Sequence, residues 1–234
     1  MVARNDFYIR DHGLPVATLF AAHRVRPTIG VRLIPLWATV IIVGCLLYNI
    51  FPAVGPVYAF DKSYPWEPVV LTTPARPILS TSDAPRNCMP SIHLALALLV
   101  WWNSRGRSWW TRLLAAAFVV ATIIATLGLG EHYVADLIVA VPFSLAFQAL
   151  WTTSVPLARW ERYGTALTAT IVSASWLIAL RFGTNAFLRL PMLSWGTALL
   201  TVFLCGWLNF RLARAAEPPG AKIPISVQHL AAAK

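Results

Sequence analysis

Long runs of apolar residues separated by short charged segments dominate this sequence. The stretches without Asp, Glu, Lys or Arg cover residues 33–60, 87–104, 113–130, 137–158, 163–180 and 190–210. A helix needs about 20 apolar residues to cross the hydrocarbon core of a bilayer. The pattern therefore predicts an all-α integral membrane protein, a helical bundle with about six transmembrane helices. In the second run, Pro90 and His93 reduce the expected helix to about 91–104.

The charged segments divide the chain into three parts. We expect a cytoplasmic or interfacial N-terminal segment over 1–32, a six-span membrane domain over 33–210 and a cytoplasmic tail over 211–234. The membrane domain includes a proline-rich connection over 53–90. Connections of this length are uncommon and are often functional.

Composition and charge agree with this interpretation. Only 12% of the residues are charged, against roughly 25% in soluble domains. The net charge of +10 does not predict nucleic-acid binding, because the basic residues lie between apolar runs. With the N-terminus inside, 14 of the 19 Lys and Arg residues fall on the inner side. The positive-inside rule then predicts cytoplasmic termini and an outer 53–90 loop.

Two polar patches interrupt the apolar pattern, and this topology places both at outer helix ends. Residues 87–93 open the second span, and residues 128–136 join the third and fourth spans. On a helix, His132 and Asp136 would share one face, with Cβ atoms about 5–6 Å apart. A carboxylate on one imidazole nitrogen makes the other a better nucleophile or base. Ser91 is suited to cap a helix whose N-terminus favours an anion.

Other interpretations of these residues remain open. His93, His132 and Asp136 could be simple interfacial residues, or together they could bind zinc or iron. A non-enzymatic transporter or assembly protein is the alternative function. A transporter is expected to place polar residues in interrupted helices at mid-membrane, whereas here they lie at helix ends.

The two patches resemble signatures of one family. The sequence Pro90-Ser91-Ile92-His93 resembles the P-S-x-H signature of the type 2 phosphatidic acid phosphatase superfamily, and 130–136 resembles its H-x-x-x-D signature. The resemblance implies that His132 attacks phosphorus and forms a phosphohistidine, and that Asp136 orients it. His93 would protonate the leaving oxygen, and Ser91 would bind phosphate. The implied chemistry requires no metal and no other cofactor.

Departures from the phosphatase pattern indicate a branch of that superfamily. Ala125 and Thr126 occupy the positions of its Ser-Arg pair, and its K-x6-R-P element is missing. We therefore expect Lys62, Arg76 and Arg86 to bind the substrate phosphate. These departures, with the run 48–58, resemble the inositolphosphotransferases, which are similar to inositol phosphorylceramide synthases. Since that branch has further helices before this point, the resemblance implies an N-terminally shortened version.

The resemblance also implies a substrate and a location. The expected function is that of a lipid phosphatase or phosphotransferase, which acts on a membrane lipid phosphate or a phosphoinositide. We expect a multi-pass protein of a bacterial plasma membrane, with its active site facing outside. The sequence indicates the lipid bilayer as a partner and identifies no protein partner.

Overall fold

The computed structural model describes residues 30–60 and 89–217, which form helices and no β-strand element. Eight helices are described: α2 (Leu33–Ile50), α3 (Pro56–Ala59), α4 (Ile92–Asn103), α5 (Trp109–Gly128), α6 (Val134–Trp151), α7 (Trp160–Phe182), α8 (Thr184–Arg189) and α9 (Pro191–Ala216). The predicted all-α fold class is confirmed.

Five of these helices, α2, α5, α6, α7 and α9, are long and apolar enough to cross a membrane. The remaining predicted span is the shorter helix α4, which has 12 residues and starts after Pro90 as the sequence indicated. Helix α9 continues to Ala216, past the expected end of the membrane domain at residue 210. The described residues therefore form a multi-pass membrane bundle, in which α4 is the shortest of the core helices.

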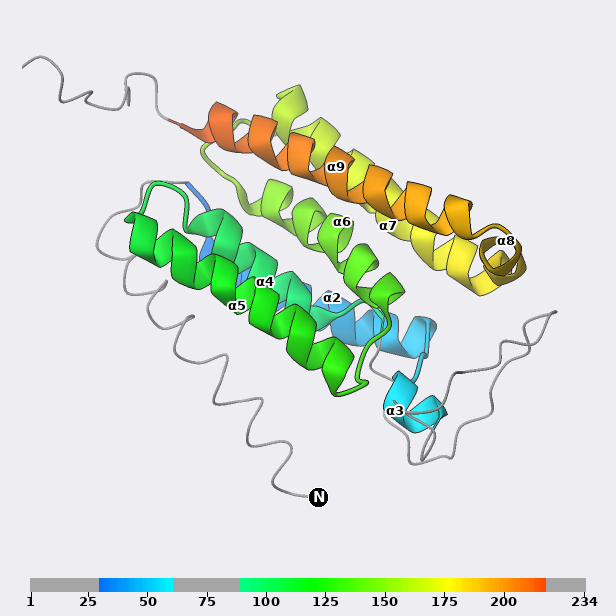
Figure 1. Ribbon diagram of the computed structural model, residues 1–234. Helices are drawn as coiled ribbons and strands as arrows, with labels where there is room; N and C mark the ends of the chain where they lie inside the picture. The colour runs from blue at the N-terminus through cyan, green and yellow to red at the C-terminus, as the bar shows by residue number, and fades with distance from the viewer. Residues whose placement is uncertain (1–29, 61–88, 218–234) are drawn as a thin grey trace, which may run out of the picture.

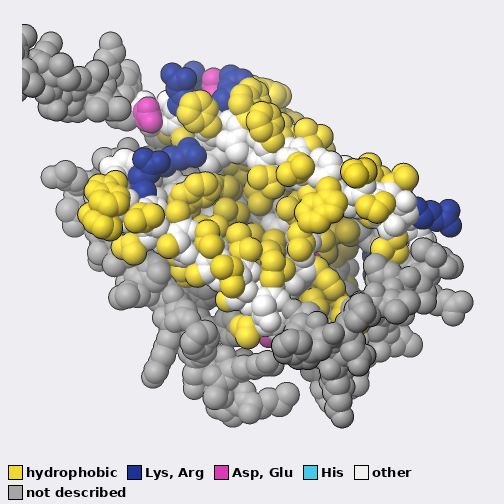
Figure 2. All heavy atoms as spheres, in the orientation of Figure 1, with side chains coloured by type: hydrophobic (Ala, Val, Ile, Leu, Met, Phe, Trp, Pro, Cys, Tyr) yellow, Lys and Arg dark blue, Asp and Glu magenta, His cyan; other side chains and the backbone are white. Residues whose placement is uncertain are grey.

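Helix α6 is the centre of the bundle. Figure 1 shows α7 and α9 on one side of it and α2, α4 and α5 on the other. In its apolar stretch 61% of the residues are buried, against 17% in α5. Apolar side chains cover the middle of the face in Figure 2, and Lys and Arg gather mainly at one end of the molecule. This is the surface expected of a helical bundle whose middle part contacts lipid.

Close approach and buried amides hold the helices around α6. A Cβ atom on Gly44 would lie 2.6 Å from the Ile92 side chain, so α2 and α4 touch at that glycine. At the other end of α4, the amides of Asn103 and Gln148 donate to each other over 2.9 and 3.2 Å. Interhelical hydrogen bonds in membrane proteins contribute on the order of 0.6 kcal/mol each, so this pair fixes register more than stability.

The segment that follows α2 packs against the turn between α5 and α6. The Val57 N–H donates to the Gly130 carbonyl over 2.9 Å. A Cβ atom on Gly55 would lie 2.5 Å from the carbonyl oxygen of Glu131. Helix α3 therefore contacts the turn that immediately precedes His132.

This contact generates a prediction about Gly55→Ala. The added methyl group would meet backbone atoms, which cannot rotate away, so we expect a loss of about 1–3 kcal/mol in the free energy of unfolding. Gly206→Ala is the matched control, because a methyl group added there would meet nothing within 4 Å and alanine favours the helix. Thermal unfolding in detergent should show a lower Tm for Gly55→Ala alone. Equal Tm values for both variants would contradict the close contact.

Candidate active site

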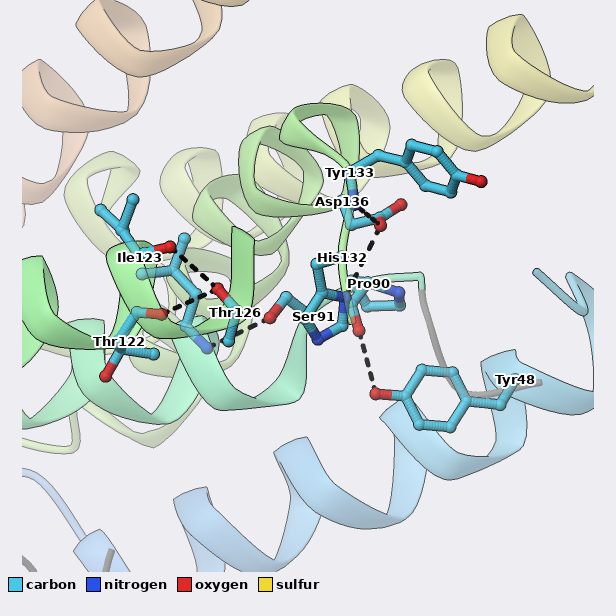
Figure 3. A network of polar contacts seen from close by, with 10 residues as sticks. Tyr48, Pro90, Ser91, Thr122, Ile123, Thr126, His132, Tyr133 and Asp136 are labelled. Carbon is cyan, nitrogen blue, oxygen red and sulfur yellow. Dashed lines mark hydrogen bonds and ion pairs between the residues drawn. The ribbon is translucent and has the colours of Figure 1, made fainter. Parts of the chain in front are cut away.

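Ser91, His93, His132 and Asp136 converge at one end of the bundle (Figure 3 labels three of them). Ser91 is the N-cap of α4, and His93 lies in the first turn of that helix. His132 lies in the turn after α5, and Asp136 lies in the first turn of α6. The His93 and His132 ring centroids are 5.8 Å apart, so the two polar patches of the sequence form a single site.

Hydrogen bonds connect the start of α4 to the start of α6. The Ser91 hydroxyl accepts from the Leu94 N–H over 3.4 Å, which confirms its predicted role as a helix cap. The Ser91 N–H donates to the carbonyl of Asp136 over 3.3 Å. The backbone therefore sets the spacing between the Ser91–His93 segment and the His132–Asp136 segment.

The prediction that His132 and Asp136 share one face of a helix is wrong, although the two side chains do meet. Helix α6 begins at Val134 with Tyr133 as its N-cap, so His132 precedes the helix. The Asp136 carboxylate accepts from the Tyr133 N–H over 2.7 Å and lies 3.6 Å from Nδ1 of His132. Asp136 thus caps its own helix, and the backbone bends back to bring His132 onto the same carboxylate.

Thr126 holds the backbone of His132 from the other side. The Thr126 carbonyl accepts from the N–H groups of Glu131 and His132 over 3.1 and 3.3 Å. Its buried hydroxyl donates to the Thr122 carbonyl over 2.8 Å. Gly130 has φ of 68° in this turn, a left-handed conformation that glycine adopts readily. The turn between α5 and α6 is therefore shaped to place the imidazole of His132.

Burial determines the electrostatics of the site. Asp136 is completely buried, and His132 is 3% exposed. A buried carboxylate is costly unless hydrogen bonds or an opposite charge offset the lost hydration. With Nδ1 of His132 facing the carboxylate, the other ring nitrogen, Nε2, is the natural nucleophile or base. The 3.6 Å gap exceeds a hydrogen bond, and catalytic contacts of this kind commonly tighten when substrate binds.

The expected phosphate-binding cations Lys62, Arg76 and Arg86 lie outside the described residues. Thr126, which stands at the arginine position of the phosphatase pattern, is neutral and holds the turn instead. In 30–60 and 89–217 there is no group of three His, Cys, Asp or Glu side chains that could hold a metal ion. Within these ranges, the side chains brought together are two imidazoles, one carboxylate and one hydroxyl.

Sequence reasoning assigned no role to Tyr48 or to the apolar side chains around the site. The Tyr48 hydroxyl on α2 donates to the carbonyl of Pro90 over 3.1 Å (Figure 3). Met89 and Ile138, which flank the two motifs, pack in one cluster with Trp176 of α7 and Phe187 of α8. Such contacts join residues far apart in the chain, so no local signal could have revealed them.

Comparison with known proteins identifies the family. The model of the PAP2 superfamily matches residues 7–150, and the chain belongs to that superfamily. Membership indicates a phosphatase-type enzyme with a helical membrane fold. No curated protein and no solved structure matches the chain. The family match ends within α6, so α7, α8 and α9 lie beyond it.

The contact of Tyr48 with Pro90 generates a prediction. Tyr48→Phe removes the hydroxyl and leaves the buried Pro90 carbonyl without this donor, which should cost about 1–3 kcal/mol. Because Pro90 precedes Ser91 and His93, we expect a lower kcat as well as a lower Tm. Tyr163→Phe, at an exposed position near the start of α7, is the control. A Tyr48→Phe protein with unchanged kcat would show that this bond does not position the site.

Proposed function

We propose that this protein transfers a phosphoryl or phosphodiester group from a membrane lipid through a phosphohistidine on His132. The observation that carries the proposal is the convergence of His93, His132 and Asp136 beside the start of α4. Superfamily membership supports phosphatase-type chemistry, and the site supplies a nucleophile, an acid and an orienting carboxylate.

In the first step, Nε2 of His132 attacks phosphorus and the bond from phosphorus to the leaving oxygen breaks. His93 donates its proton to that oxygen, which spares the formation of a free alkoxide. The attacking imidazole becomes positively charged, and the buried Asp136 carboxylate stabilises that charge. The positive end of α4 attracts the phosphate oxygens.

In the second step, an acceptor hydroxyl attacks phosphorus and the bond from phosphorus to nitrogen breaks. His93, now neutral, removes the acceptor's proton and is ready for another cycle. Water as acceptor makes the enzyme a phosphatase, and an alcohol makes it a transferase. We propose an inositol-like alcohol, and the support is the replacement of the phosphatase Ser-Arg pair by Ala125 and Thr126.

The substrate is a lipid phosphate or phosphoinositide, and the reaction takes place at the outer face of a bacterial plasma membrane. Support for a lipid comes from the position of the site at the end of a bundle with five candidate spans. Support for the outer face comes from the excess of basic residues in the segments assigned to the inside. The direct test is release of phosphate or headgroup from a panel of lipid phosphates and phosphoinositides by purified protein.

The division of roles between the two histidines generates a prediction. His93→Ala should lose at least about 100-fold in rate on a lipid alkyl phosphate, yet keep most activity on an aryl phosphate with an acidic leaving group. Asp136→Asn should lose comparable activity on both substrates, because the imidazolium loses its stabilising charge. The rates with each substrate check this assignment. A similar loss on both substrates for His93→Ala would contradict its role as the acid.

Thr126 is neutral where the phosphatase pattern has an arginine, and this difference generates another prediction. If Lys62, Arg76 or Arg86 binds the phosphate, changing the relevant residue to Met should reduce kcat/KM by about 100- to 1,000-fold, as when a charged donor to an oxyanion is lost. Arg181→Met and Arg189→Met are the controls, since these exposed arginines flank α8. Full activity in the triple Met variant would show that the clamp lies elsewhere.

A further inference from the structure

The turn between α4 and α5 carries an unusual concentration of positive charge, far from the candidate active site. Arg105 and Arg107 lie in this turn, and Arg112 lies in the first turns of α5. There is no Asp or Glu anywhere from residue 89 to residue 130. Figure 2 shows basic side chains gathered at this end of the molecule, where α9 also ends.

Three other arginines at this end, Arg159, Arg162 and Arg211, contact the protein. Arg159 and Arg211 lie 3.4 and 3.9 Å from the carboxylate of Glu161. Arg162 donates to three carbonyls around the end of α6, those of Ala149, Leu150 and Val155. These contacts give each of the three arginines a structural role.

Arg105 is also engaged, and it fixes the turn. Its guanidinium donates to the Asn209 carbonyl of α9 over 3.3 Å. Burial lowers the pKa of Arg105, and the nearby charge of Arg112 lowers it further, while Glu217 at the end of α9 opposes the shift. The turn is therefore held against α9 by this hydrogen bond, and the charge of Arg112 is unfavourable to that of Arg105. An anion beside them would relieve that repulsion.

Exposed tryptophans stand next to these arginines. Trp109 and Trp110 are 61% and 58% exposed, and their rings stack with centroids 3.7 Å apart. Trp101, near the end of α4 and so before the turn in the chain, is also exposed. Tryptophan is enriched where the apolar part of a bilayer meets the headgroups. The surface thus combines cationic groups with exposed aromatic rings of the kind found at the membrane interface.

We propose that Arg107, Arg112, Trp109 and Trp110 bind an anionic phospholipid from the leaflet that faces the turn between α4 and α5. The guanidinium groups hold the headgroup phosphate, and the indoles pack against its glycerol and upper acyl chain. An inorganic anion would use the arginines but not the tryptophans. The binding is separate from the reaction at His132 and does not depend on the proposed function.

The test uses the full-length protein in nanodiscs that contain equal amounts of phosphatidylglycerol and phosphatidylcholine. Native mass spectrometry measures which lipid stays bound after release. We expect the unmodified protein to retain phosphatidylglycerol preferentially. Each arginine near an anionic surface contributes a factor of about five, so Arg107→Gln with Arg112→Gln should reduce the preference by about 25-fold.

The chain offers a matched control in Arg181→Gln with Arg189→Gln, which removes two exposed arginines at the other end of the bundle. This pair should keep the lipid preference. The single variant Arg112→Gln, at an exposed position, covers the case in which the double variant does not fold. The proposal is overturned if the unmodified protein shows no preference, if the Arg107 and Arg112 variants keep it, or if both double variants lose it equally.

Discussion

The buried carboxylate of Asp136 is the constraint on which the site depends. It accepts the Tyr133 N–H at the start of α6, faces the imidazole of His132, and belongs to the residue whose carbonyl accepts the Ser91 N–H. A completely buried carboxylate is stable only while such partners compensate for its lost hydration. The start of the central helix, the imidazole of His132 and the start of α4 are therefore placed by one residue.

The rest of the bundle serves to keep that residue in position. Helix α6 is surrounded by α2, α4, α7 and α9. The C-terminal helices lie beyond the family match, yet Trp176 and Phe187 pack in the same cluster as Met89 and Ile138. The residues just before Ser91 and just after Asp136 thus pack in the same apolar cluster.

Much of the bundle could be predicted from the sequence, because bilayer thickness sets helix length and charges mark helix ends. The exceptions have physical reasons. Helix α9 continues past its apolar run because Arg211 and Arg214 are good helix formers, and their side chains lie over the rings of Trp207 and Phe210. Periodicity did not predict the short helix α8, which fills the connection between α7 and α9.

The site was predictable in composition but not in geometry. The residue types and order of the two patches identified Ser91, His93, His132 and Asp136, and the structure brings all four together. Helical spacing predicted a helical backbone at His132, and this is wrong. Asp136 caps α6 at Tyr133, so His132 lies before the helix. The support from Tyr48 crosses 42 residues of chain, a distance over which local patterns carry no information.

The most direct test of this account is to trap the covalent enzyme. Purified protein would be mixed with a lipid phosphate, quenched in base within one turnover, digested and analysed by mass spectrometry. The account predicts a base-stable, acid-labile phosphoryl group on His132 that chases into product and is absent from His132→Ala. Full turnover by His132→Ala would contradict the account. A phosphoryl group that chases into product from a residue other than His132 would also contradict it.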